Sequence, residues 1–139
     1  MPERAERSAR VNSTVLAFDF GIKRIGVAVG EPELGTAHPL AGIERFEEIP
    51  SLIEQWRPAA LVVGRPARAD GRAHDMTRRA EDFARRLERR FKLPVTRVDE
   101  RYSSVEAESR LRGAKHRPVD SVAAQLLLEQ YFGETRGSA

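Results

Sequence analysis

The sequence contains no cysteine, only three histidines and few aromatic residues, which make up 6% of its 139 positions. Without cysteine, a disulfide framework and a thiolate metal site are both excluded. No apolar run approaches the roughly 18 residues that a membrane-spanning helix needs. The first residues, MPERAERSARVNS, carry charges but no apolar core, which predicts that they are not a signal peptide. We therefore expect a cytoplasmic protein with no membrane partner.

The remaining composition is that of one globular domain. Hydrophobic residues make up 40% of the chain and charged residues 32%, a mixture that is not typical of disorder. A chain of this length can bury a hydrophobic core without disulfides or structural metals. Because no repeat or linker divides the sequence, we predict a flexible arm over 1–13, one folded domain over 14–133 and a tail over 134–139.

The basic residues are mostly arginine, and the net charge is +3 with an isoelectric point near 9.8. Arginine suits bidentate contacts to phosphate, and Arg85-Arg86 and Arg89-Arg90 form a dense basic cluster. Glu81, Asp82 and Glu88 alternate with these arginines, so a solvated helix face is the preferred interpretation of the cluster by itself. The charge permits a nucleic-acid partner without requiring one.

Apolar runs and periodicities predict the order of the elements. Strands are expected over 15–20, 25–29, about 38–43, 59–63 and 94–98, the last near a sheet edge, and helices over 49–56, 73–91, 103–111 and from 118 onward. Residues 65–71 and the basic segment 113–117 are expected to be loops. Three hairpin-linked strands followed by alternating helices and strands predict an α/β fold, with a five-stranded mixed sheet flanked by helices.

Three acidic residues occupy special places in this scheme. Asp19 lies within the apolar first strand, where a carboxylate is costly unless it is paired, accepts hydrogen bonds from the following turn or ligates a metal. Glu100 follows the last strand in Asp99-Glu100-Arg101, where the spacing alone favours an ion-paired loop. Asp120 is in the first turn of the last helix, where the helix dipole alone favours an acid. Open α/β sheets commonly gather such positions at one edge.

Converging carboxylates, with no cysteine and little histidine, suit hard cations such as Mg²⁺ or Mn²⁺. Two such ions about 4 Å apart can activate water and stabilise the leaving oxygen during phosphodiester hydrolysis. We therefore predict that Asp19, Glu100 and Asp120 are both the catalytic residues and the metal ligands of a nuclease. Basic residues near this site are expected to contact nucleic-acid phosphates: Lys23, Arg24, Arg65, Arg68, Arg101, Lys115 and Arg117.

Four segments resemble, in order and spacing, the RuvX/YqgF family: LAFDFGIKRIGVAVG, LVVGRPARADG, VTRVDERYSSVEAE and VDSVAAQLLLEQYF. The resemblance covers about Val15 to Phe132. That family has a ribonuclease H-like fold and is described both as a Holliday junction resolvase and as a nuclease that matures the 5′ end of pre-16S rRNA. By this resemblance, Asp19 matches the first-strand acid, Glu100 the acid of the D-E-R motif and Asp120 the acid that opens the last helix.

The sequence departs from the family pattern at two places that remove no carboxylate. Arg65 replaces an apolar residue before Pro66, and Tyr102-Ser103-Ser104 replaces Leu-Ser-Thr. Junction resolvases outside this family carry their second acid on the fourth strand, but this fourth strand, LVVG, has none. Glu100 must therefore reach in from the neighbouring strand, about 10 Å from the first strand at roughly 4.8 Å per strand. Two side chains and a metal pair can span that distance.

The expected function is metal-dependent endonuclease cleavage of structured nucleic acid, either rRNA precursor or branched DNA, with ribosomal particles as a further candidate partner. A monomer and a homodimer both remain open, although symmetric cutting of a junction would need a two-fold dimer. One alternative is a non-catalytic nucleic-acid or ribosome-associated module on the same fold. Another is an actin-like or sugar-kinase-like ATPase, since Asp19-Phe20-Gly21 resembles its first phosphate loop. The chain lacks the second domain and second glycine-rich loop of such ATPases.

Overall fold

The computed structural model describes residues 13–65, 71–100 and 119–138, with the backbone alone described for 71–74, 119–120 and 136–138. The predicted helix over 103–111 and the predicted basic loop over 113–117 lie outside these ranges. The elements are β1 (Val15–Phe20), β2 (Ile25–Glu31), β3 (Thr36–Ile43), η1 (Phe46–Glu48), α2 (Ile49–Trp56), β4 (Ala60–Arg65), α3 (Gly71–Phe91), β5 (Val95–Asp99) and α5 (Val119–Ser138).

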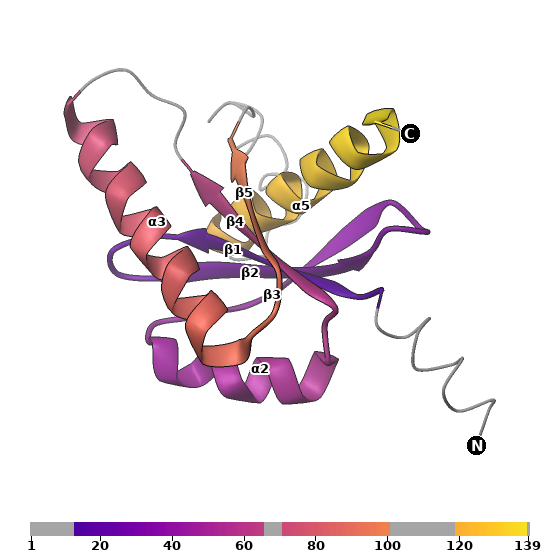
Figure 1. The fold of residues 1–139 in the computed structure, drawn as a ribbon, viewed down its shortest axis with the longest axis horizontal. Helices are drawn as coiled ribbons and strands as arrows, with labels where there is room; N and C mark the ends of the chain where they lie inside the picture. Colours follow the sequence, from indigo (N-terminus) through magenta and orange to yellow (C-terminus); the bar gives the residue numbers. More distant parts are fainter. Residues whose placement is uncertain (1–12, 66–70, 101–118, 139) are drawn as a thin grey trace.

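The five strands form one mixed sheet, as predicted from the sequence, and their order is β3-β2-β1-β4-β5. The antiparallel pairs are β1–β2 and β2–β3, whereas β4 is parallel to both β1 and β5. Strand β5 lies at the edge of the sheet, also as expected. Because β1, β4 and β5 are parallel neighbours, the residues at their carboxyl ends lie along one edge of the sheet, the edge formed by strand ends and not by an outer strand (Figure 1).

The turn between β1 and β2 depends on a glycine. A Cβ atom at Gly21 would lie 2.6 Å from the carbonyl oxygen of Arg24, which is closer than a side chain tolerates. Residue 21 therefore has to be glycine for Phe20 to pair with Ile25 across the hairpin. The predicted antiparallel hairpin is confirmed.

Several element boundaries differ from the sequence prediction. The predicted loop over 65–71 was wrong at both ends, because Arg65 pairs with Asp99 in the β4–β5 ladder and Gly71 begins α3. The short helix η1 was not predicted. The Glu48 carboxylate accepts the backbone N–H groups of Glu44 and Arg45 at 2.8 and 3.0 Å, and these bonds lower the pKa of Glu48. At the other end of the chain, α5 continues through Ser138, into the segment expected to be a tail.

Helices cover both faces of the sheet, so the hydrophobic core has two layers. On one face, α2 and α3 pack over Leu16, Phe18 and Val63. On the other face, α5 packs over Ala17 and Val62 (Figure 1). Side chains alternate between the faces of a strand, so odd-numbered residues of β1 lie on the α5 face. Within the described residues, no helix combines the length and apolar character that crossing a membrane requires.

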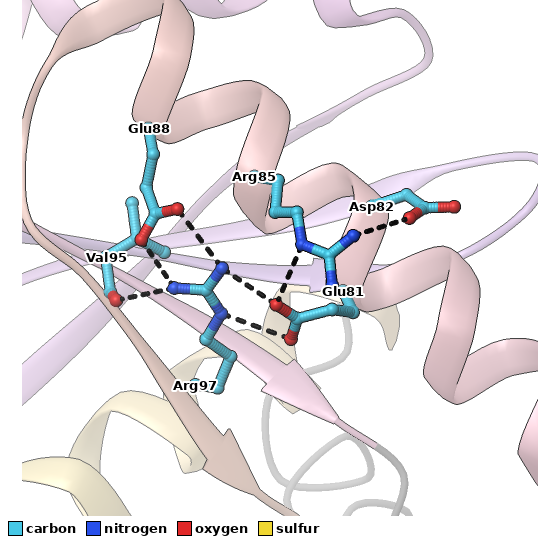
Figure 2. A network of polar contacts seen from close by, with 6 residues as sticks. All are labelled: Glu81, Asp82, Arg85, Glu88, Val95 and Arg97. Carbon is cyan, nitrogen blue, oxygen red and sulfur yellow. Dashed lines mark hydrogen bonds and ion pairs between the residues drawn. The ribbon is translucent and has the colours of Figure 1, made fainter.

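An arginine joins the edge strand β5 to helix α3 (Figure 2). The Arg97 guanidinium donates to the Glu88 carboxylate at 2.6 Å and to the Glu81 carboxylate at 2.9 Å. It also donates to the carbonyl oxygen of Val95 at 3.1 Å. The hydrogen bond from Arg97 lowers the pKa of Glu88, and the same contacts raise the pKa of Arg97. The network therefore holds the end of the sheet that leads to Glu100.

We expect Arg97→Ala to lower the free energy of unfolding by about 1–3 kcal/mol, the range for lost hydrogen bonds to charged groups. The substitution also leaves Glu81 and Glu88 facing each other without a cation. Arg97→Lys should recover only part of the loss, because an ammonium lacks the planar fork that engages two carboxylates. Urea denaturation of the three proteins checks both statements.

The same network predicts that the stability of the protein depends on pH. The folded-state pKa of Glu88 is below its ordinary value of 4.5, so its stabilising contribution is present above that value and is lost as the pH falls through the lowered pKa. The stability difference between wild type and Arg97→Ala should therefore shrink in acid below about pH 4.5. A difference that stays constant down to acid pH would contradict this role for the ion pair.

Candidate active site

Two of the three predicted acids lie on the same face and at the same edge of the sheet. Asp19 is the fifth residue of β1, and Val15 and Ala17 before it pack in the core layer under α5. By strand alternation Asp19 shares that face. It is half-buried, so its place at the strand end is less enclosed than the apolar run suggested. Glu100 directly follows β5 and is also half-buried.

Glu100 reaches over β4 because β4 carries a glycine at that point. A Cβ atom built on Gly64 would lie 2.8 Å from Glu100 Oε2 and 3.2 Å from Glu100 Cγ. The same Cβ atom would lie 2.8 Å from Leu127 Cδ2 of α5, which shows that Glu100 lies on the α5 face. Continuing the β1–β4 register by one residue places Gly64 beside Asp19. The carboxylate of Glu100 therefore covers the strand next to Asp19.

The backbone around Glu100 is held from two sides. Its N–H donates to the carbonyl oxygen of Arg65 at 2.9 Å, which extends the β4–β5 ladder by one residue. The carbonyl oxygen of Asp99 accepts a bond from the Gln130 side chain of α5 at 2.6 Å. The Asp99 carboxylate pairs with Arg65 at 3.1 Å. These contacts fix the point from which the Glu100 side chain departs.

The position of Asp120 follows from its neighbour in α5. Ser121 is fully buried and its hydroxyl donates to the carbonyl oxygen of Leu40, while the Val27 N–H donates to the same hydroxyl at 3.4 Å. Val27 lies next to Gly26, which pairs with Asp19 across the β1–β2 ladder. Ser121 thus anchors the start of α5 near the edge that carries Asp19. The side chain of Asp120 lies outside the described residues.

The donor set is suited to a hard divalent cation, since Asp19 and Glu100 both offer carboxylate oxygens. Within the described ranges, no group of three or more histidine, cysteine, aspartate or glutamate side chains gathers closely enough to form a metal centre. The described part of the site therefore consists of the carboxylates of Asp19 and Glu100. The third predicted ligand, Asp120, belongs to α5, which begins close to them.

Among the predicted phosphate contacts, Lys23 and Arg24 are exposed in the β1–β2 turn at the same edge. Gly21, Ile22 and Met76 line an open surface hollow of about 630 Å³ together with them. Arg65 is partly engaged by Asp99, as described above. The remaining predicted contacts lie outside the described residues: Arg68, Arg101, Lys115 and Arg117.

Comparisons with known proteins agree with this architecture. Thermus thermophilus RuvC, solved in complex with a Holliday junction substrate, matches with a TM-score of 0.64 at 16% identity, over 91% of this chain and 98% of RuvC. The fold is therefore α/β of the ribonuclease H-like kind. The family model RuvX, described as a Holliday junction resolvase, matches residues 13–134. The chain belongs to the RuvX family of nucleases.

Curated relatives give the same assignment. A protein of Nitrosomonas europaea is 51% identical over 95% of both chains, and one of Dechloromonas aromatica is 52% identical over 86% of this chain and 90% of its own. Both carry the name "Putative pre-16S rRNA nuclease". The match to each relative spans nearly the full length of both chains.

Sequence reasoning missed three residues that build the site. Gly64 was interpreted only as the end of a strand, although a glycine in a strand also signals that another group approaches the backbone closely. Ser121 and Gln130 gave no sequence signal, because polar residues on a helix are usually exposed. Their roles depend on which strands lie beneath α5.

We expect Gly64→Ala to reduce nuclease activity at least 10-fold while the protein stays folded. The added methyl group would meet Glu100 Oε2 and Leu127 Cδ2, each at 2.8 Å, so the carboxylate has to move away from its place over β4. If the displaced group is a metal ligand, the variant should also need more Mn²⁺ to reach half its maximal rate. The rate measured against Mn²⁺ concentration, with circular dichroism for the fold, checks this.

Gly133→Ala is the matched control. Gly133 lies in α5, the helix that packs on the same face of the sheet, but a Cβ atom there would meet nothing within 4 Å. This substitution should leave activity unchanged and stabilise α5 by up to about 1 kcal/mol, the difference in helix propensity between alanine and glycine. Equal losses of activity in both variants would remove the special role assigned to Gly64.

Proposed function

We propose that this protein is a metal-dependent endonuclease that cleaves phosphodiester bonds at the 5′ end of pre-16S rRNA. The observation that carries the proposal is the Glu100 carboxylate, which lies over Gly64 at the sheet edge that also bears Asp19. The names of the curated relatives support the choice of substrate. The ribonuclease H-like fold and the position of Glu100 directly after β5 are compatible with phosphodiester hydrolysis.

In this mechanism Asp19, Glu100 and Asp120 would hold one or two Mg²⁺ or Mn²⁺ ions. Such ions supply Lewis acidity and lower the pKa of water for attack on phosphorus. Glu100 presents its oxygens from a fixed backbone position, which limits the reorganisation needed when substrate binds. Lys23 and Arg24 are exposed at the same edge, and in this mechanism they contact substrate phosphates near the site and orient the strand.

Holliday junction cleavage is the second candidate function, because the matching family model carries that description. Symmetric cutting of two opposed strands requires two active sites related by a two-fold axis. Trimming one RNA end requires a single site. Parallel cleavage assays on a 5′-extended 16S rRNA precursor and a four-way DNA junction, each with Mg²⁺ or Mn²⁺, separate the two functions. Cleavage of neither substrate, with retained binding, would favour the non-catalytic module.

Asp19→Asn should abolish cleavage and leave the fold intact. Asparagine keeps the volume of the side chain but removes the charge that holds the metal, so the rate should fall by orders of magnitude. Loss of a carboxylate without its metal should leave the melting temperature in EDTA equal to or above that of wild type. Wild-type turnover by the asparagine variant would disprove the assignment of Asp19.

Glu100→Gln and Asp120→Asn should each remove most activity, and the double variant should be little worse than either one. Ligands of one centre act as a unit, so their effects are not additive. Each single variant should also require more Mn²⁺ for its residual rate. If Glu100 only forms an ion pair and Asp120 only stabilises its helix, each change should instead cost about 0.5–1 kcal/mol of stability with normal turnover. Rates against Mn²⁺ concentration and melting temperatures distinguish the two cases.

A further inference from the structure

A basic surface lies between η1, α2 and the last turns of α3. It is separate from the carboxylate edge, the edge of the sheet that carries Asp19 and Glu100. It is a hollow of about 460 Å³, here called the arginine groove, lined by Phe46, Glu47, Pro50, Arg86, Arg89 and Arg90. Helix α3 begins at Gly71, six residues after β4 ends at the carboxylate edge. Met76 of α3 lines a hollow together with Lys23 and Arg24 at the carboxylate edge, so at about 1.5 Å per residue Arg86 and Arg90 lie about 15 and 21 Å along α3 from that edge.

Five arginines of α3 fall into two groups. Arg79 pairs with Asp75 at 3.1 Å, and Arg85 pairs with Glu81 at 3.6 Å and Asp82 at 3.7 Å. These arginines are partnered by acids of their own helix, which agrees with the interpretation of a solvated face.

The second group lines the groove. Arg89 and Arg90 lie three and four residues after Arg86, spacings at which like charges repel and destabilise a helix. The helix dipole favours Arg89 and Arg90 in the last turn, but it does not explain Arg86 one turn earlier or the hollow between them. A cluster that opposes helix stability in this way is suited to an anionic ligand.

Arg86 is held in an orientation that suits phosphate. Its guanidinium lies 3.9 Å from the centre of the Phe46 ring, and Phe46 stacks on Phe91 with an angle of 20° between the rings. This contact with the ring restrains the guanidinium without using its N–H groups, which stay available to a phosphate. Glu47 approaches Arg86 only to 3.9 Å, and both side chains are more than half exposed, so this pair is weak and easily displaced.

We infer that the arginine groove binds the backbone phosphates of the nucleic-acid substrate, at a place distinct from the carboxylate edge. This inference rests on the proposed function, and it adds a substrate requirement. A helical arm that starts at the cut site has to extend along α3 to reach the groove. At roughly 2.8 Å per base pair of A-form RNA, about 21 Å corresponds to roughly seven or eight base pairs.

Two RNA hairpins with the same 5′ extension but stems of 4 and 16 base pairs test the inference. The proteins are wild type, Arg89→Ala/Arg90→Ala and the matched control Arg79→Ala/Arg85→Ala, which removes two arginines from the same helix. Binding is measured by fluorescence anisotropy in EDTA at several salt concentrations, so that no metal-dependent cleavage occurs. Cleavage of both hairpins is measured separately with Mn²⁺.

The groove variant, Arg89→Ala/Arg90→Ala, should bind the long hairpin at least 10-fold more weakly at low salt. It should also reduce the magnitude of the log–log salt slope by about 1.4 to 1.8, since each of the two lost phosphate contacts contributes roughly 0.7–0.9. Its binding and cleavage of the short hairpin should be normal, and the control should behave as wild type on both. Equal losses in the groove variant and the control, an unchanged slope, or binding of a poly-glutamate peptide in preference to both hairpins would overturn the inference.

These outcomes remain separate from those of the proposed function. Cleavage of the short hairpin together with an unchanged slope on the long one rejects the groove and leaves the nuclease intact. Groove-dependent binding of the long hairpin without cleavage of either one rejects the nuclease and leaves the groove as a nucleic-acid contact.

Discussion

The carboxylate of Glu100 lies where a side chain of β4 would otherwise be, and the geometry of the site depends on this placement. Asp19 and Glu100 belong to strands that are two places apart, with β4 between them. A side chain at Gly64 would occupy the space that Glu100 Oε2 now fills, 2.8 Å from the position of the missing Cβ atom. The absence of a side chain on the middle strand thus lets an acid from the outer strand act beside the first one.

This arrangement makes the edge strand β5 part of the proposed active site, although edge strands are usually the less constrained part of a sheet. Strand β5 has a neighbouring strand on one side only, and two helices on opposite faces of the sheet hold it in place. Arg97 ties β5 to α3 through Glu81 and Glu88, and Gln130 ties the end of β5 to α5 through the carbonyl oxygen of Asp99. The acid is therefore presented from a backbone that is fixed on both sides.

Helix α3 combines two roles along its length. Its ion pairs with Arg97 support the sheet, and arginines that face the groove are available to a ligand because the acids of the helix lie elsewhere. The cluster Arg85-Arg86 and Arg89-Arg90 looked uniform in the sequence. Only the packing of η1 and α2 against α3, with Phe46 beneath Arg86, distinguishes Arg86 from Arg85.

The sequence by itself determined the five strands, the helices α2, α3 and α5 and their order, because apolar periodicity and glycine or proline at the ends act over a few residues. Runs such as Val15–Phe20 and Ala60–Arg65 are strands for this local reason, and a short connection makes the first two strands a hairpin. Asp19 and Glu100 could be proposed as site residues from their places at strand ends. Tertiary structure decided how Glu100 reaches Asp19, that Arg65 pairs with Asp99, and that Ser121 and Gln130 anchor α5. Those contacts join residues far apart in the chain, and their distances depend on which strands and helices pack together.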